Sequence, residues 1–284
     1  MVSLVQEKNS NFQRDNYMLN NMLKKEDLIN AGSHYGHPTS KWHPNYKEFI
    51  VGKKNGIHII DVEATLTYLD SAMKEILNIV KSGGNVLFVG TKAQARDAVV
   101  DNADKCGMFY IVERWLGGTL TNFSTIKKSI KRLKLLEKET STIYNNLTKK
   151  EKNQLYREKF KLADLHRGIK DMRHLPAALF VVDAKHEKIS IAEANCLGIP
   201  TFGLVDSNTN PLTLDYPIPA NDDSIKTIKL LLSFVSDSIK DSLNVNKEDV
   251  ATQEETNETD NKSNQNTETD TDKQAAELSN VDKK

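Results

Sequence analysis

Three histidines lie close together near the N-terminus, in a stretch that invites a metal-site interpretation. His34, His37 and His43 occur within "AGSHYGHPTSKWHP". A zinc site needs three or four ligands at suitable spacing, and no Cys, Asp or Glu lies between Asn30 and Glu48. We therefore expect no metal site. The loop can instead pack against a sheet end or contact nucleotide groups.

A second candidate for chemistry is "VLFVGTKAQA", an apolar strand followed by Gly90-Thr91 and a helix-like segment. Free backbone amides at such a turn can hold a phosphate. The segment has one glycine, whereas a dinucleotide fingerprint needs three, and it lacks a Walker loop. Asp183 and Asp206 follow later strands, where α/β enzymes place catalytic groups, but aspartates also cap turns. A nucleotide-binding enzyme of flavodoxin-like fold is therefore the alternative hypothesis.

Strands and helices alternate around these candidates. The apolar runs predict strands at 56–60, 85–90, 108–113, 177–184 and 199–208. Helical periodicity predicts helices at 24–32, 62–84, 92–107, 186–198 and 222–243. Alternation at crossover spacing favours an α/β domain with a parallel sheet and helices on both faces.

One segment, about 120–170, breaks the alternation. Leu120, Phe123, Ile126, Ile130, Leu133 and Leu136 recur at spacings of three and four, and "LTKKE" then opens a second helix with a capping box. Leu155, Leu162, Leu165, Ile169 and Met172 follow at heptad-like spacing. The pattern predicts an antiparallel coiled-coil hairpin. It holds fourteen bases and five acids, a net charge of +9, which suits a polyanion.

Composition bounds the rest of the chain. Residues 244–284 carry a net charge of −6 and almost no apolar residues, which predicts a disordered acidic tail. We expect a flexible N-terminal extension at 1–22 and the α/β domain at 23–243. No apolar run approaches the roughly 18 residues of a membrane span, and the first 30 residues lack a signal-peptide pattern. Cys106 and Cys196 are expected to be buried thiols in a reducing compartment.

Several motifs, in order, resemble the S-two family of bacterial ribosomal small-subunit proteins. They are "AGSHYGHPTSKWHPNYKEFI", "NGIHIIDVEATL", "VLFVGTKAQA", "YIVERWLGGTLTNFSTIKKSIKRL", "GIKDMRHLPAALFVVDAKHEKISIAEANCLGIPTFGLVDSN" and "LDYPIPANDDSIKTIKLL". The resemblance covers about residues 22–242. It implies a flavodoxin-like α/β domain with a protruding helical hairpin, no catalytic activity and no cofactor.

The resemblance also implies partners and a location. These are small-subunit ribosomal RNA and neighbouring ribosomal proteins, including the large messenger-binding S-one protein, whose attachment the family supports. Neither a membrane nor DNA is expected as a partner. The chain would be a structural, non-enzymatic part of the cytoplasmic bacterial ribosome that supports translation.

Family motifs and hairpin charge together give the expected RNA-contacting or site-shaping residues. They are His37, Lys41, Trp42, Arg114, Trp115, Gly117, Gly118, Thr119, Asn122, Lys127, Lys128, Lys131, Arg132, Lys170 and Arg173. Gly36, Pro44 and Asp171 also stand at characteristic family positions. A third hypothesis, a coiled-coil adaptor, would have the hairpin bind protein alone.

Overall fold

The computed structural model describes residues 23–138 and 147–244. The extension predicted at 1–22, residues 139–146 within the predicted hairpin and nearly all of the predicted acidic tail lie outside the described residues. The chain divides into a unit of residues 1–240 and a second unit of residues 241–284. The elements below belong to the first unit, except that the last described turn of the C-terminal helix lies in the second.

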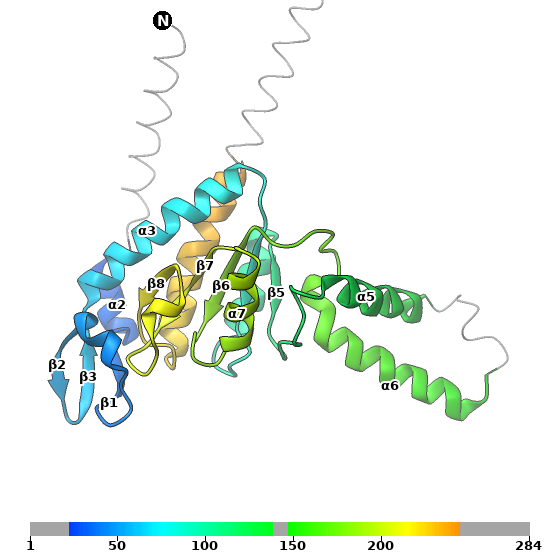
Figure 1. The fold of residues 1–284 in the computed structure, drawn as a ribbon, viewed down its shortest axis with the longest axis horizontal. Coiled ribbons are helices and arrows are strands. Elements are labelled where there is room, and N and C mark those ends of the chain that lie inside the picture. Colours follow the sequence, from blue (N-terminus) through cyan, green and yellow to red (C-terminus); the bar gives the residue numbers. More distant parts are fainter. Residues whose placement is uncertain (1–22, 139–146, 245–284) are drawn as a thin grey trace, which may run out of the picture. The chain divides into compact units, whose positions relative to one another are not determined.

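The predicted parallel sheet is confirmed, with five strands in the order β5-β4-β6-β7-β8 (Figure 1). The strands are β4 (Val86–Val89), β5 (Phe109–Ile111), β6 (Ala178–Val182), β7 (Thr201–Val205) and β8 (Tyr216–Pro219). Numbered from β4, this order is 2-1-3-4-5, which is consistent with a flavodoxin-like fold. β8 was not expected from the sequence, because it contains two prolines, which cannot donate backbone hydrogen bonds to a neighbouring strand. The prolines are accommodated because β8 lies at the edge of the sheet.

Helices cover both faces of this sheet (Figure 1). Leu87 and Val89 of β4 share a core cluster with Ile191 and Ala194 of α7 (Lys188–Cys196). A Cβ built on Gly90 would instead meet Val99 of α4 (Arg96–Cys106), so alternate positions point to the opposite face. The described C-terminal helix, residues 225–244, is tied to α4 where Ser236 Oγ donates to Asn102 Oδ1 at 2.9 Å.

The N-terminal part differs from the expectation. The segment 56–60 was expected to join the parallel sheet, but β3 (Ile57–Ile60) pairs antiparallel with β1 (Tyr35–Pro38) and β2 (Ile50–Lys54). β1 lies in the stretch expected to be a loop, and η1 (Pro44–Phe49) follows it. The expectation was wrong because an isolated apolar run does not reveal its strand partners. The helices α2 (Lys25–Ala31) and α3 (Val62–Lys81) agree with the prediction, and Asp61 caps α3 through the Glu63 amide at 2.9 Å.

Two long helices fill the segment that breaks the alternation, α5 (Phe123–Glu137) and α6 (Lys149–His166). The apolar stripe predicted on α5 is buried, and the predicted Thr148–Glu151 capping box opens α6. Ser129 Oγ lies 2.8 Å from His166 Nε2 and Arg132 Nε lies 2.9 Å from Glu158 Oε1, so the two helices run in opposite directions. α6 ends earlier than expected, because the chain continues as η3 (Arg167–Ile169).

η3 lies against the outer edge of the parallel sheet. A Cβ on Gly168 would stand 2.2 Å from the Tyr110 carbonyl oxygen, closer than real atoms allow. Glycine at this position therefore lets η3 approach β5 closely enough to cover its open edge.

Three further features concern the described residues. Cys106 is buried as expected, but Cys196 is exposed at the end of α7, so the prediction of two buried thiols was half wrong. None of the described helices is both long enough and apolar enough to span a membrane. The short helix η4 (Pro211–Thr213) connects β7 to β8.

Candidate nucleic-acid interface

A buried carboxylate organises the loop that leads into α5. Glu193 Oε1 accepts the indole N–H of Trp115 at 3.0 Å and the Gly118 amide at 2.8 Å. Its Oε2 accepts the Leu120 amide at 2.9 Å, and the amide and hydroxyl of Thr121 at 3.1 Å each. Burial opposes ionisation, but the bonds from the indole and the amides lower the pKa of Glu193 below its usual value. The loop is therefore folded around a fixed negative charge.

This arrangement assigns roles to the "ERWLGG" residues. The side chain of Trp115 is buried, so it cannot stack on a nucleic-acid base, and it shapes the loop instead. Gly118 has φ +88°, a conformation that favours glycine, and the buried Thr119 donates its hydroxyl to the Leu116 carbonyl. Gly117 and Arg114 are exposed beside this fixed frame.

Asn122 stands at the junction between the loop and α5. Its Oδ1 accepts hydroxyl protons from Ser124 at 3.2 Å and Thr125 at 2.9 Å. It makes no side-chain bond to a helix amide, so it orders the hydroxyls of the first turn without capping the backbone.

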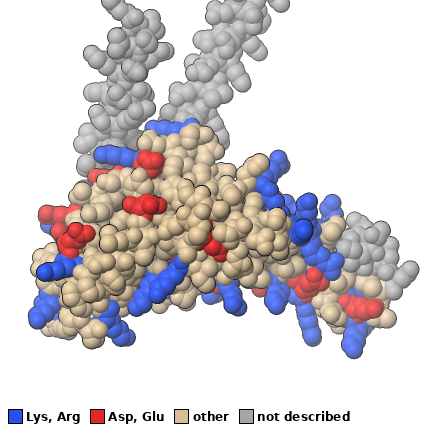
Figure 2. All heavy atoms as spheres, in the orientation of Figure 1, with Lys and Arg blue, Asp and Glu red and all other residues tan. Residues whose placement is uncertain are grey.

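In the arm, defined as the described residues 120–138 and 147–170, most basic side chains form no ion pair with a described residue. Ion pairs take up four of the fourteen bases: Arg132 with Glu158, Lys134 with Asp171, Arg167 with Glu113 and Lys170 with Glu137. The other ten, including Lys127, Lys128 and Lys131, form no ion pair with any described residue. Lys127 Nζ lies 4.8 Å from the centre of the Phe123 ring. On the face shown in Figure 2, Lys and Arg side chains gather over α5 and α6.

The remaining predicted residues lie on other elements. Lys41 and Trp42 are exposed between β1 and η1, and the Trp42 ring lies 5.3 Å from the His58 ring. Arg173 is exposed after η3 and forms no ion pair with a described residue. Arg132 and Lys170, in contrast, serve first as links within the arm, because each already holds a glutamate. The sequence could not distinguish paired from unpaired lysines.

His37 belongs to an acidic cluster at the carboxyl edge of the parallel strands. Its Nδ1 lies 2.9 Å from Asp206 Oδ2 and its Nε2 lies 3.4 Å from Asp223 Oδ2. The hydrogen bond with Asp206 raises the pKa of His37. A charged carboxylate environment repels phosphate, so His37 is poorly placed for the RNA contact predicted from the sequence.

Lys92 neutralises the same cluster from within. Its Nζ lies 2.7 Å from Asp222, 2.6 Å from Asp223 and 3.2 Å from Asp183. Burial disfavours the charged ammonium, but the aspartates raise the pKa of Lys92 above its usual value. Burial together with Asp183 and Asp206 raises the pKa of Asp222 to about 7. Asp222 and Asp223 precede the C-terminal helix, whereas the sequence placed them in its first turn.

The cluster also corrects one step of the metal argument. The expectation of no metal relied on the lack of acidic ligands near His37 in the sequence. The fold brings ligand atoms of His37, Asp206, Asp222 and Asp223 within 4.8 Å of one another, a set that can hold a divalent cation. Lys92 already supplies a positive charge next to two of these carboxylates.

The Gly90-Thr91 turn has its donors occupied. Thr91 donates its amide (2.9 Å) and its hydroxyl (2.6 Å) to Glu187 Oε1, whose pKa is raised by burial. An internal carboxylate thus takes the place that a phosphate would need. Asp183, with φ +68°, accepts the amides of Lys185 and His186, as a turn residue does. These contacts weigh against the alternative of a nucleotide-binding enzyme.

Sequence reasoning missed the three residues that organise these regions, Glu187, Glu193 and Lys92. Each lies far in sequence from its partners, by 72 to 78 residues for Glu193, 96 for Glu187 and up to 131 for Lys92. The sequence offered one signal for the two glutamates: both lie in the helix predicted at 186–198, which was expected to pack on the sheet. A charged side chain that is buried when its helix packs needs a partner, so each glutamate could have been expected to bind one.

Comparisons with known proteins give matches that cover nearly all of the described chain. A family model described as "Ribosomal protein S2" matches residues 28–242. A protein named "Small ribosomal subunit protein uS2" from Chloroherpeton thalassium is 49% identical over 228 residues, 80% of this chain and 91% of that protein. Proteins of the same name from Cytophaga hutchinsonii and Chlorobaculum tepidum are each 48% identical, over 79% and 75% of this chain and 89% and 86% of theirs. These relatives are ribosomal proteins and not enzymes.

Proposed function

Since this chain belongs to the ribosomal protein S2 family, we propose that it is a structural component of the small ribosomal subunit that binds its RNA mainly through the arm. The assignment to the small subunit is based on the names of the relatives. The arm bases that form no ion pair with a described residue support the mode of binding, because each phosphate that a lysine neutralises releases counterions. The chain is accordingly proposed to act at the ribosome in the cytoplasm.

The arm is proposed to be an antiparallel coiled coil. Support comes from the buried stripe on α5 and from the opposed pairing of Ser129 with His166 and Arg132 with Glu158. Leu155, Leu162 and Leu165 of α6 are half-buried. A rigid pair of helices keeps its charges at fixed spacing, which lowers the entropy cost of matching a folded RNA.

Two classes of residue are proposed within the interface. Basic side chains that form no ion pair with a described residue make contacts with RNA: Lys41, Arg114, Lys127, Lys128, Lys131 and Arg173, with Trp42 as an exposed ring for stacking. Shaping residues hold the frame: Trp115, Gly117, Gly118, Thr119 and Asn122 around Glu193, with Arg132 and Lys170 linking the arm. His37 belongs to the shaping class because its ring is engaged by aspartates.

Protein partners are proposed for the sheet domain. Residues 1–243 carry a net charge of +6, less than the +9 of the segment 120–170, so the rest of the body is slightly negative. A surface of that kind suits neighbouring ribosomal proteins as well as RNA. The family resemblance extends this to attachment of the S-one protein. The adaptor hypothesis, in which the arm binds protein alone, gives no role to the ten arm bases that form no ion pair with a described residue.

Footprinting of small-subunit ribosomal RNA tests the proposal. The protein is expected to protect a defined set of nucleotides, and the Lys127→Ala/Lys128→Ala/Lys131→Ala variant is expected to lose part of that set. A matched control, Lys74→Ala/Lys226→Ala/Lys229→Ala, removes three exposed lysines of the body that form no ion pair with a described residue. Loss of the same protections in both variants, or no protection by the wild type, would contradict the proposal.

A further inference from the structure

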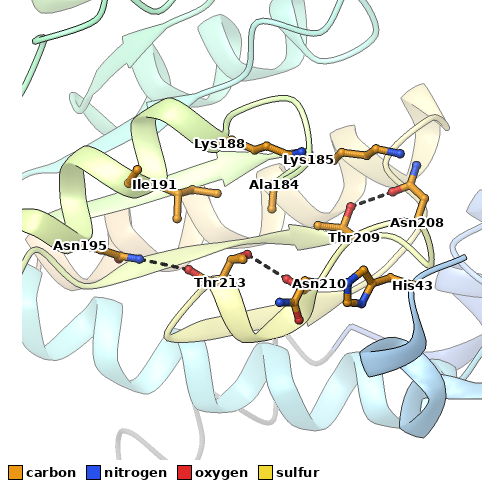
Figure 3. Close-up of a pocket in the computed structure, with 11 residues that line it drawn as sticks. His43, Ala184, Lys185, Lys188, Ile191, Asn195, Asn208, Thr209, Asn210 and Thr213 are labelled. Atoms are coloured by element: carbon orange, nitrogen blue, oxygen red, sulfur yellow. Dashed lines mark hydrogen bonds between the residues drawn. The ribbon is translucent and has the colours of Figure 1, made fainter.

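A cavity of about 380 Å³ lies between α7 and the loop that follows β7 (Figure 3). Lys188, Ala192 and Asn195 line it from α7, at spacings that place them on one helix face. Asn210 lines it from the β7–η4 loop and His43 from the segment before η1. Its volume lies within the range of sites that hold small molecules.

The position of the cavity relates to how ligands bind in this architecture. Open parallel sheets bind ligands outside the carboxyl ends of their strands, where the strand order reverses. That reversal lies between β4 and β6, and it is closed by the contacts of Lys92 with Asp183 and of Thr91 with Glu187. The cavity lies beyond the carboxyl ends of β6 and β7, which leaves an open site one strand away.

The charge of the lining is entirely positive. Lys185 and Lys188 contribute to the cavity, and none of the eleven lining residues is Asp or Glu. Both lysines are exposed, and neither forms an ion pair with a residue in the described part of the chain. Two ammonium groups without counter-charges at one cavity attract an anion, and a phosphate accepts from several donors at once.

Neutral polar groups on the opposite wall are held in fixed orientations. Asn210 Oδ1 accepts from Asn45 Nδ2 at 3.0 Å and from the Leu212 amide at 3.2 Å, which leaves its own amide hydrogens for a ligand. His43 Nδ1 accepts the Asn45 amide at 3.2 Å, so a neutral ring carries its proton on Nε2 and can donate it.

Apolar groups complete the cavity. Ala184, Ile191 and Ala192 present hydrocarbon beside the polar groups. A ligand that satisfies the whole lining therefore has an anionic group, hydrogen-bonding edges and an apolar face. A nucleotide has all three, in its phosphate, the edges of its base and the face of its base.

We propose that this cavity binds one nucleotide of an RNA chain, with its phosphate at Lys185 and Lys188 and its base between Ala192 and the Asn210 wall. The choice of RNA as the source rests on the proposed function, whereas the chemistry of recognition is shared with a free mononucleotide. The site would give the sheet domain a contact with unpaired RNA, separate from the phosphate contacts of the arm.

The first test uses nuclear magnetic resonance of the full chain with adenosine monophosphate, adenosine and inorganic phosphate. Amide shifts are expected to change within 184–195 and 208–213 with adenosine monophosphate, and much less with either fragment. Lys185→Ala/Lys188→Ala should weaken binding about 10-fold or more, since two charge-assisted contacts are lost. Ala192→Phe keeps the charge but fills the cavity, and should weaken binding similarly. The control Lys74→Ala/Lys229→Ala should stay within about twofold, because it removes equal charge elsewhere.

The second test distinguishes the source of the nucleotide. A single-stranded hexanucleotide RNA should shift the same amides, and Ala192→Phe should abolish these shifts. The arm variant Lys127→Ala/Lys128→Ala/Lys131→Ala should retain them, so the cavity is measured independently of the arm.

Several results would overturn the inference. They are an absence of shifts in the cavity, equal shifts in Ala192→Phe, equal shifts with a hexaglutamate peptide, or binding of the mononucleotide without the RNA. In each case the ribosomal RNA footprint by the arm can persist, so the proposed function would stand while the cavity inference fails. Loss of the footprint with retained cavity shifts would contradict the proposed function and leave the binding of a nucleotide in the cavity supported.

Discussion

The carboxyl edge of the sheet and the arm use the same charged residue types in opposite ways. At the sheet edge, one lysine meets three aspartates, and the Glu187 carboxylate accepts two hydrogen bonds from Thr91. Next to it along the chain, on α7, the Glu193 carboxylate accepts five hydrogen bonds from the loop that leads into α5. On the arm, ten of fourteen bases form no ion pair with a described residue. The contrast indicates that the place where a related fold would bind a ligand is satisfied internally, and that the free charge is displayed elsewhere.

Removing Lys92 should give the largest loss of stability. Lys92→Met leaves Asp183, Asp222 and Asp223 close together without their cation, and breaking a mostly buried ion pair is expected to cost about 2–4 kcal/mol. The free energy of unfolding in urea measures it. Lys74→Met, at an exposed site without an ion pair to a described residue, should change stability by less than about 0.5 kcal/mol. Equal stability of the two variants would mean that the sheet edge does not depend on internal neutralisation.

Glu193→Gln should give the next largest loss of stability. One carboxylate oxygen becomes an amide that donates, so it faces amides or an indole that also donate, and two or three donors lose their acceptor. Buried donors without partners cost about 1–3 kcal/mol in total for a site of this kind. Glu48→Gln, at an exposed position, is the matched control. An unfolding free energy unchanged in Glu193→Gln would contradict the role given to this carboxylate.

The pH dependence of stability sharpens the same point. Hydrogen bonds from Trp115 and the loop amides hold the pKa of Glu193 below its usual value despite burial. A depressed folded-state pKa gives stability that is present above the unfolded value, about 4.3 for Glu, and is lost as pH falls through the folded pKa. Wild-type protein should therefore lose more stability below about pH 4.3 than Glu193→Gln does. Parallel acid-unfolding curves would contradict this assignment.

The smallest effect is expected on the arm itself. Glu158→Gln breaks the half-exposed pair with Arg132, which should cost about 0.5 kcal/mol of unfolding free energy. Glu158→Gln also removes one negative charge from the arm, so RNA binding should tighten slightly and depend more steeply on salt. Weaker RNA binding by this variant would mean that the pair matters for arm geometry more than for charge.

Much of this organisation was predictable from local patterns. The apolar run Val86–Val89 and the Thr148–Glu151 capping box each depend on residues near in sequence, and each was predicted correctly. The partnership of β3 with β1 and β2 was not, because strand pairing is decided by contacts distant in sequence. For the same reason the sequence left open whether Trp115 contacts RNA or shapes the site, because its partner Glu193 lies 78 residues away. The buried frame of a site is thus harder to predict than its exposed charge.

The most direct test of the central claim is the salt dependence of binding to small-subunit ribosomal RNA, measured for the wild type and for Lys127→Ala/Lys128→Ala/Lys131→Ala. The logarithm of the binding constant should fall with the logarithm of salt concentration less steeply in the variant, by about 2–3 in slope for three lost phosphate contacts. The control Lys74→Ala/Lys226→Ala/Lys229→Ala should keep the wild-type slope. Equal slopes for the wild type and the arm variant would contradict the claim that the arm binds RNA through its unpaired charge.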